Sequence, residues 1–109
     1  MKRIEAVVRQ ETVSDVKAAL EGVPHIGLRV CETDEHDGQE GTMLRYRGSS
    51  YLSDSTQRAC VCVLVDDADS SAAVDAIAGA ARTGHDEDGF ICVVPCDEVV
   101  EISGQPVAT

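Results

Sequence analysis

The feature that most limits the fold of this chain is a pattern of strand, helix and strand that occurs twice in succession. Alternating or continuous apolar residues predict four strands, at residues 3–9, 26–33, 59–65 and 90–95. In the first strand Ile4, Ala6 and Val8 share one face, and in the second we expect the same of Ile26, Leu28 and Val30. The tail at 97–109 is expected to add only a short helical turn and a small edge strand.

Helical spacing of apolar residues predicts one helix inside each unit. The first helix, at about residues 12–22, follows polar side chains from Thr12 onward that can accept hydrogen bonds from free backbone N–H groups. Gly22 is expected to end it. The second helix spans about residues 70–82. Its predicted buried face consists of Ala73, Val74, Ile77 and Ala81.

The element order βαββαβ predicts an α+β, ferredoxin-like fold, in which a four-stranded antiparallel sheet carries two helices on one face. A chain of 109 residues is the size of a single domain, so we expect one domain over residues 1–109. The third strand is apolar on both faces. Helices can cover one of these faces, and the other favours an oligomeric partner.

Residues 36–56, between the second and third strands, lack an apolar period and are rich in Gly, Ser, Asp and Arg. A connection of this length without secondary structure is uncommon in a small domain and is usually functional or disordered. We therefore expect a long functional loop at this place.

Twenty acidic and nine basic residues give a formal net charge of −11. A field of this sign repels nucleic-acid phosphates and anionic lipids, so we expect no nucleic-acid partner and no membrane-surface role. The acidic residues are scattered, which is typical of a solvated surface. One hypothesis for their number is a halophilic protein, whose carboxylates keep it hydrated in a high-salt cytoplasm.

The start of the sequence lacks the apolar run of a signal peptide, and no stretch approaches the roughly 18 apolar residues of a membrane span. We therefore expect a cytoplasmic protein without membrane insertion. Five cysteines are an odd number, and together with the lack of an export signal this argues against a disulfide framework.

Two thiols and two histidines raise the alternative of a metal site. Cys60 and Cys62 lie two positions apart in a predicted strand, so they share a face on which two thiolates can bind a soft metal. Packing as small hydrophobic side chains is the other interpretation. His36 and His85 stand beside acidic residues, where they can ligate a metal or remain solvated. A metal-binding trimer based on Cys60 and Cys62 is therefore kept as an alternative function.

The sequence shows no nucleophile paired with a base, so we expect no enzymatic activity. The acidic run at 86–88 lacks the ligand spacing of a calcium loop. An acylphosphatase-like hydrolase has the same topology, but the first strand and turn here lack a phosphate-cradling loop with a matching arginine and asparagine. Catalysis therefore has no positive support in the sequence.

Several segments, in order and at the expected spacing, together resemble the PII nitrogen-regulatory family. They are the opening MKRIEAVVR, GTMLRYRGSSY at 41–51, AARTG at 80–84, Asp88–Gly89, and Val94–Pro95 followed by Glu98–Val100. The likeness is to a divergent member and extends over nearly the whole chain. It implies a homotrimer whose sheets form a central barrel, with three clefts between subunits that bind ATP or ADP.

The resemblance assigns the segment at 36–56 to the family's T-loop, which docks on ammonium transporters or nitrogen-metabolism enzymes after rearranging with nucleotide and 2-oxoglutarate. It implies a partner-binding loop containing Tyr46, Arg47, Gly48, Ser49 and Tyr51. Arg47 is the leading contact, because a guanidinium group donates paired hydrogen bonds to a carboxylate. In relatives the tyrosine at the position of Tyr51 can be nucleotidylated and a serine at that of Ser49 phosphorylated. Both hydroxyls permit such modification here without requiring it.

The resemblance also implies a set of nucleotide-binding residues. Those present here are Gln39, Arg58, Arg82, Thr83, Gly84, Asp88 and Gly89. The glycines usually seen ahead of the loop are replaced by Glu35 and Asp37, and Arg58 only partly replaces the usual lysine. The turn is expected to offer its backbone N–H groups and arginine charge to phosphates.

Three further departures weaken the phosphate site. Family members normally carry a lysine where this chain has Phe90, and arginines where it has Glu101 and Ser103. Each charge-assisted contact contributes about 1.5–3 kcal/mol, so tight ATP binding in the usual manner should be lost. We expect no required cofactor. The candidate effectors are ATP, ADP or AMP, and 2-oxoglutarate is disfavoured.

The charge of −11 predicts that stability rises with salt concentration. Salt screens repulsion among the carboxylates, which opposes the compact state in dilute buffer. Thermal unfolding in dilute buffer and in molar potassium chloride measures the effect. Equal unfolding midpoints in both would contradict the high-salt hypothesis.

Overall fold

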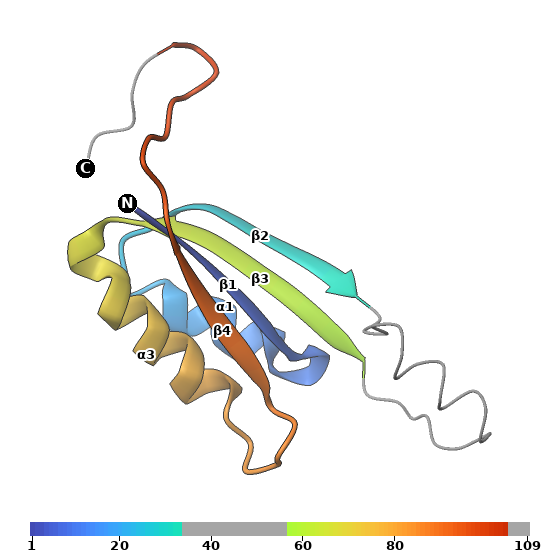
Figure 1. Cartoon of the computed structure of the whole chain (residues 1–109). Coiled ribbons are helices and arrows are strands. Elements are labelled where there is room, and N and C mark those ends of the chain that lie inside the picture. Colours follow the sequence, from blue (N-terminus) through green and yellow to red (C-terminus); the bar gives the residue numbers. More distant parts are fainter. Residues whose placement is uncertain (34–56, 105–109) are drawn as a thin grey trace.

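The computed structural model describes residues 1–33 and 57–104, which form a sheet with two helices (Figure 1). The strands are β1 (Lys2–Arg9), β2 (Ile26–Thr33), β3 (Arg58–Val65) and β4 (Gly89–Pro95). The helices are α1 (Val13–Leu20) and α3 (Ser70–Ala81), and each follows a short 3-10 helix, Gln10–Thr12 or Asp67–Asp69. All four predicted strands and both predicted helices are therefore present.

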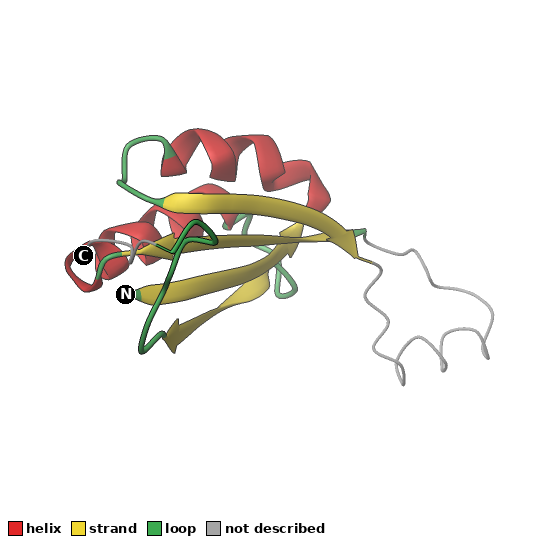
Figure 2. Cartoon of the chain, turned by 90° about the horizontal axis from the view of Figure 1, so that it is seen from above, coloured by secondary structure: helices red, strands yellow, loops and turns green. Residues whose placement is uncertain are grey.

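The four strands form one antiparallel sheet with the order β2-β3-β1-β4. Ile4 of β1 lies opposite Val63 of β3 and Val93 of β4. Both helices lie on the same side of this sheet (Figure 2). The predicted ferredoxin-like α+β fold is confirmed.

The core lies between the sheet and the helices and is almost entirely aliphatic. Alternate residues of β1 and β3 point into it, which explains the period of two in their burial. Leu20 of α1 and Ile77 of α3 are fully buried against these strands. The buried strand residues are Ile4, Ala6, Val8, Ala59, Val61, Val63 and Val65.

The other side of the sheet, which we call the open face, is not covered by a helix. On it Val7 of β1 lies beside Cys60, and Leu64 of β3 lies beside Arg3. Cys60, Cys62 and Leu64 are half-buried, while their neighbours along β3 are fully buried. The third strand is thus apolar on both faces, as the sequence predicts.

Strand β2 departs from the sequence-based prediction because its register shifts between Ile26 and Arg29. Gly27 lies in this irregular stretch with a φ of 68°, a conformation that glycine adopts without strain. Ile26 pairs with Leu64 on the open face, whereas Val30 pairs with the buried Val61 on the helix face. The prediction that Ile26 and Val30 share a face is therefore wrong.

The helix ends and the tail also differ from prediction. Helix α1 is shorter than predicted, and no side chain caps its N-terminus. The Thr12 hydroxyl instead donates a 2.8 Å hydrogen bond to the carbonyl of Arg9. In the described part of the tail, 96–104, Val100 forms an isolated bridge, and the N–H of Gly104 closes a turn on the carbonyl of Glu101 at 2.8 Å.

Antiparallel pairing brings the ends of all four strands together at one end of the sheet. Arg9 at the end of β1 lies opposite Arg58 at the start of β3, and Arg58 lies opposite Thr33 at the end of β2. Val8 pairs with Gly89, the first residue of β4. Thr33 and Arg58, the strand residues before and after the undescribed segment 34–56, therefore pair close to the turn that precedes Gly89.

Within residues 1–33 and 57–104, no helix has the length and apolar character needed to cross a membrane.

Gly89 generates a prediction because its φ is 123° and an added Cβ would lie 1.9 Å from the carbonyl oxygen of Val7. We expect Gly89→Ala to lower the free energy of unfolding by about 2–6 kcal/mol, from backbone strain and displacement of β1. Gly84→Ala is the matched control, since its φ is 96° but nothing lies within 4 Å of the added Cβ. Its expected loss is about 1–3 kcal/mol in the same denaturant titration. Equal losses would contradict the steric account.

Candidate functional site

The candidate site is the polar turn between α3 and β4. Helix α3 ends at Ala81 because Arg82 adopts extended backbone, with φ −77° and ψ 119°. Gly84 then takes a φ of 96°, which favours glycine. These two changes of direction leave the N–H groups of Thr83 and Gly84 outside the helix, where they point to a common acceptor.

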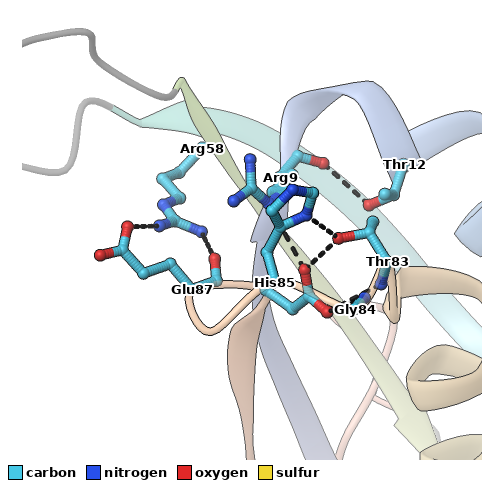
Figure 3. A network of polar contacts seen from close by, with 8 residues as sticks. Arg9, Thr12, Arg58, Thr83, Gly84, His85 and Glu87 are labelled. Carbon is cyan, nitrogen blue, oxygen red and sulfur yellow. Dashed lines mark hydrogen bonds and ion pairs between the residues drawn. The ribbon is translucent and has the colours of Figure 1, made fainter.

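That acceptor is the carboxylate of Asp88. Its Oδ2 accepts hydrogen bonds from the backbone N–H of Thr83 at 2.7 Å and of Gly84 at 3.1 Å. Its Oδ1 accepts a further bond from the Thr83 hydroxyl, which also lies 2.8 Å from Nδ1 of His85. The turn therefore already binds an anion, and that anion is its own side chain (Figure 3).

These contacts stabilise the ionised form of Asp88. The hydroxyl and backbone N–H of Thr83, followed by the N–H of Gly84 and the charge of Arg9, lower the pKa of Asp88 to about 2. The carboxylate is consequently ionised at neutral pH. A phosphate group that needs the same N–H groups would have to displace it.

Two arginines from neighbouring strands are likewise held by acidic residues of the turn (Figure 3). Nε of Arg9 lies 3.4 Å from Oδ1 of Asp88, and it makes no hydrogen bond within the described part of the chain. Arg58 donates a 2.6 Å hydrogen bond to the carbonyl of Glu87, and its Nη2 lies 3.6 Å from the Glu87 carboxylate. Both arginine side chains are largely buried, at 15% and 13% exposure.

The formal charges of the site balance. The turn and the strand ends beside it contain three arginines, Arg9, Arg58 and Arg82, and three acidic residues, Asp86, Glu87 and Asp88; Arg9 pairs with Asp88 and Arg58 with Glu87. Only Arg82 among these arginines is exposed. A polyphosphate approaching the turn would thus meet no net positive charge, in contrast to the usual arrangement around phosphates.

A pocket of about 220 Å³ adjoins the turn. Its apolar lining comes from β1, α3 and β4 and includes Val7, Ala78, Ala81 and Ile91, while Arg82 and Asp88 provide polar groups at its rim. Phe90 also lines it and is 60% exposed in the single chain. An aromatic ring at this position can stack on a flat ligand but cannot pair with a phosphate.

The structure brings together six of the seven nucleotide-binding residues that the sequence predicts. These are Arg58, Arg82, Thr83, Gly84, Asp88 and Gly89, all at the end of the sheet where β4 begins. The expectation that the turn offers free N–H groups differs from the structure, because Asp88 occupies those of Thr83 and Gly84. Gly89 has a structural role, since its backbone lies against Val7.

Other predicted residues lie elsewhere. Gln39 and the predicted partner-binding residues Tyr46, Arg47, Gly48, Ser49 and Tyr51 lie outside the described residues, as do Glu35, Asp37 and His36. Glu101 and Ser103 follow the far end of β4, because Pro95 pairs with Lys2 whereas Gly89 pairs with Val8. In one chain they are thus separated from the turn by the length of a strand (Figure 1).

Arg9 is the site residue that sequence reasoning missed. Its position at the end of β1 indicates that it lies on the same face as Val7, but only the antiparallel register places it opposite Arg58 and beside Asp88. A residue-by-residue alignment of the first and third strands is the signal that identifies Arg9.

The described residues give little support to the hypothesis of a metal site at Cys60 and Cys62. Cys60 and Cys62 do share the open face, and both are free thiols. However, residues 1–33 and 57–104 contain no group of three or more His, Cys, Asp or Glu side chains arranged to hold a metal ion. His85 contacts Thr83 instead of a second ligand.

Comparison with known proteins gives a consistent result. A family model described as Nitrogen regulatory protein P-II matches residues 1–105. A protein named Nitrogen regulatory protein P-II from Nostoc punctiforme is 38% identical over 102 residues, covering 94% of this chain and 91% of the relative. Proteins of the same name from Synechocystis sp. and Azospirillum brasilense are each 37% identical, with the same coverage. The likeness spans both halves of the fold.

The lowered pKa of Asp88 generates a prediction about acid stability. The folded pKa of about 2 lies below the ordinary value of about 3.9, so the carboxylate stabilises the fold fully above pH 4 and progressively less as pH falls toward 2. We expect the difference in thermal midpoint between wild type and Asp88→Asn to be constant from pH 7 to 5 and to shrink from pH 4 to 2. Asp86→Asn, at an exposed position of the same turn, is the control. A constant difference down to pH 2 would contradict the assignment.

Proposed function

The chain belongs to the nitrogen regulatory protein P-II family, and from that premise we propose that it is a trimeric, cytoplasmic regulator with a weakened phosphate site. In this proposal residues 36–56 bind a protein partner. An adenine nucleotide with few phosphates, such as AMP, is the effector, and it binds at a cleft between subunits.

The observation that carries the proposal is the pairing of the cationic side chains at the turn. Arg9 lies beside Asp88 and Arg58 beside Glu87, so their charges are already compensated by carboxylates. Phe90, which lines the adjoining pocket, adds no positive charge. The turn therefore favours ligands that do not depend on strong phosphate contacts.

The adjoining pocket supports a small adenine ligand. Its volume of about 220 Å³ lies below the roughly 300–1,000 Å³ of typical small-molecule sites, so it suits a base better than a whole triphosphate. Val7, Ala81 and Ile91 supply apolar surface, and Phe90 supplies a ring for stacking. In the proposed trimer the cleft becomes deeper, because a second copy would lie against the open face.

The open face supports the trimer. Leu64 and Val94 flank Arg3 on it, and exposed Phe90 extends its apolar surface. A sheet covered by helices on one side only normally buries its other side against a partner when that side is apolar. Two further copies of this chain would cover it, as the family relationship suggests. The tail residues Glu101 and Ser103 could then approach the turn of a neighbouring copy.

The protein partner is proposed to be an ammonium transporter or an enzyme of nitrogen metabolism. The proposal for Arg47 as the main contact rests on its chemistry, because an arginine pairs with partner carboxylates. The position of the segment also fits, since Thr33 and Arg58, the strand residues before and after it, pair next to the polar turn between α3 and β4. An effector bound at the turn would therefore act next to the partner-binding segment.

Calorimetric titration of the purified protein with ATP, ADP, AMP and 2-oxoglutarate tests the proposed effector site. We expect weak or absent ATP binding by wild type. The triple variant Phe90→Lys, Glu101→Arg, Ser103→Arg should bind ATP at least about 100-fold more tightly, since two new contacts of about 1.5 kcal/mol suffice for that factor.

The charge-matched control is the double variant Glu21→Arg, Asp75→Lys, which raises the net charge by the same four units at exposed helix-side positions. It should leave ATP binding unchanged. Tight ATP binding by wild type would refute the weakened phosphate site. Binding of zinc or copper without any nucleotide response, abolished by Cys60→Ser with Cys62→Ser, would support the metal-binding alternative instead.

A further inference from the structure

Two acidic side chains of the polar turn pair with arginines, but the fold holds them differently. Asp88 is only 20% exposed, and its carboxylate accepts hydrogen bonds from the backbone N–H groups of Thr83 and Gly84. Glu87 is 73% exposed, and its carboxylate meets the guanidinium group of Arg58. Asp88 is therefore built into the turn, whereas the Glu87 carboxylate lies largely in solvent.

The two contacts between Arg58 and Glu87 differ in the same way (Figure 3). Nη1 of Arg58 donates a 2.6 Å hydrogen bond to the backbone carbonyl of Glu87. Nη2 lies 3.6 Å from Oε1 of the Glu87 carboxylate, which is an ion pair beyond hydrogen-bond distance. The backbone contact anchors the arginine, and the side-chain contact can be given up without releasing it.

The carboxylate and the guanidinium group also differ in what they lose when they separate. An exposed carboxylate is solvated by water as soon as it leaves, so its ion pair contributes little to stability. The side chain of Arg58 is only 13% exposed, and a largely buried cation requires an anionic partner. A ligand oxyanion that reaches Nη2 can therefore replace the Glu87 carboxylate while the arginine stays anchored.

We propose that Glu87 is a specificity-determining residue of the effector site, where its carboxylate competes with ligand phosphate groups for Arg58. The inference rests on the proposed function, because it concerns the same turn and takes an adenine nucleotide as the effector. It adds a residue that the predicted nucleotide-binding set does not contain. The ligands that Glu87 disfavours are those with phosphate charge, and neutral adenosine is unaffected.

The position of this pair keeps it within reach of a ligand in an assembled protein. Arg58 is the first residue of β3, and Glu87 lies two residues before β4. Both are thus at the end of the sheet and not in the middle of its open face. In the proposed trimer the cleft between subunits borders this turn, so covering the open face does not bury the exposed Glu87 carboxylate.

Asp86 allows the contact to be separated from the net charge of the turn. It precedes Glu87 directly, carries the same charge and is exposed. Neutralising either residue changes the long-range field of the turn alike. In the described part of the chain, however, Arg58 pairs with Glu87 and not with Asp86.

The test is a calorimetric titration of wild type, Glu87→Gln and Asp86→Asn with adenosine, AMP and ATP. We expect Glu87→Gln to bind AMP and ATP at least about 10-fold more tightly than wild type, as for one regained charge-assisted hydrogen bond. Asp86→Asn should change these affinities by less than about 2-fold at physiological salt, which screens exposed charges. Adenosine should bind equally to all three proteins.

Inorganic phosphate is a second probe, which does not depend on the nucleotide. In 15N-labelled Glu87→Gln, the side-chain NMR signals of Arg58 should shift at about 10-fold lower phosphate concentration than in wild type or Asp86→Asn. This result without binding of any adenine ligand would refute the proposed effector but support the role of Glu87. The two proposals can thus fail separately.

Two results would overturn the inference. The first is equal affinity of Glu87→Gln and Asp86→Asn for both AMP and phosphate, which would reduce Glu87 to a contribution to net charge and leave the proposed function intact. The second is a change in adenosine binding as large as that in AMP binding, which would give Glu87 a role in shaping the turn. Circular dichroism of each variant verifies that the fold is intact.

Discussion

The structure depends on one constraint, which is that the sheet can bury only its aliphatic, helix-facing side within a chain of this size. Ile4 and Val63, opposite each other on neighbouring strands, meet Leu20 and Ile77 of the helices and leave no room for polar side chains. The charged side chains and most of the thiols are therefore displaced to the open face and to the ends of the strands. The polar turn before β4 lies at one such end, and four of the five cysteines lie on the open face.

At the turn, a side chain of the protein accepts the backbone hydrogen bonds that a bound anion would otherwise accept. The N–H groups of Thr83 and Gly84 need an acceptor because helix α3 has ended, and Asp88 is close enough in sequence to supply one. The same carboxylate also lies beside Arg9 and so neutralises a charge that is largely shielded from solvent. The contact orders the turn, and a competing phosphate would disrupt that order.

The sequence predicts the elements well because their signals are local. Alternation in β1 and helical spacing in α3 each follow from a few neighbouring residues. The site is harder to predict because it depends on register. Arg9 meets Asp88 only after β1 pairs with β3 and β4, and no local pattern indicates that pairing. The expected cap at Thr12 failed for a related reason, since a 3-10 turn before α1 turned its hydroxyl toward Arg9.

Register also decides which face of the sheet carries each side chain of β2. Without the irregularity between Ile26 and Arg29, continuous pairing from Ile26 with Leu64 would set Val30 opposite Cys60 and turn Cys31 toward the helices. The extra residue near Gly27 reverses this, so that Val30 completes the core and Cys31 faces Cys60. A single glycine with positive φ thus decides which side chains of β2 enter the core. Its substitution would move the thiol and the core residue together, because neither can change faces alone.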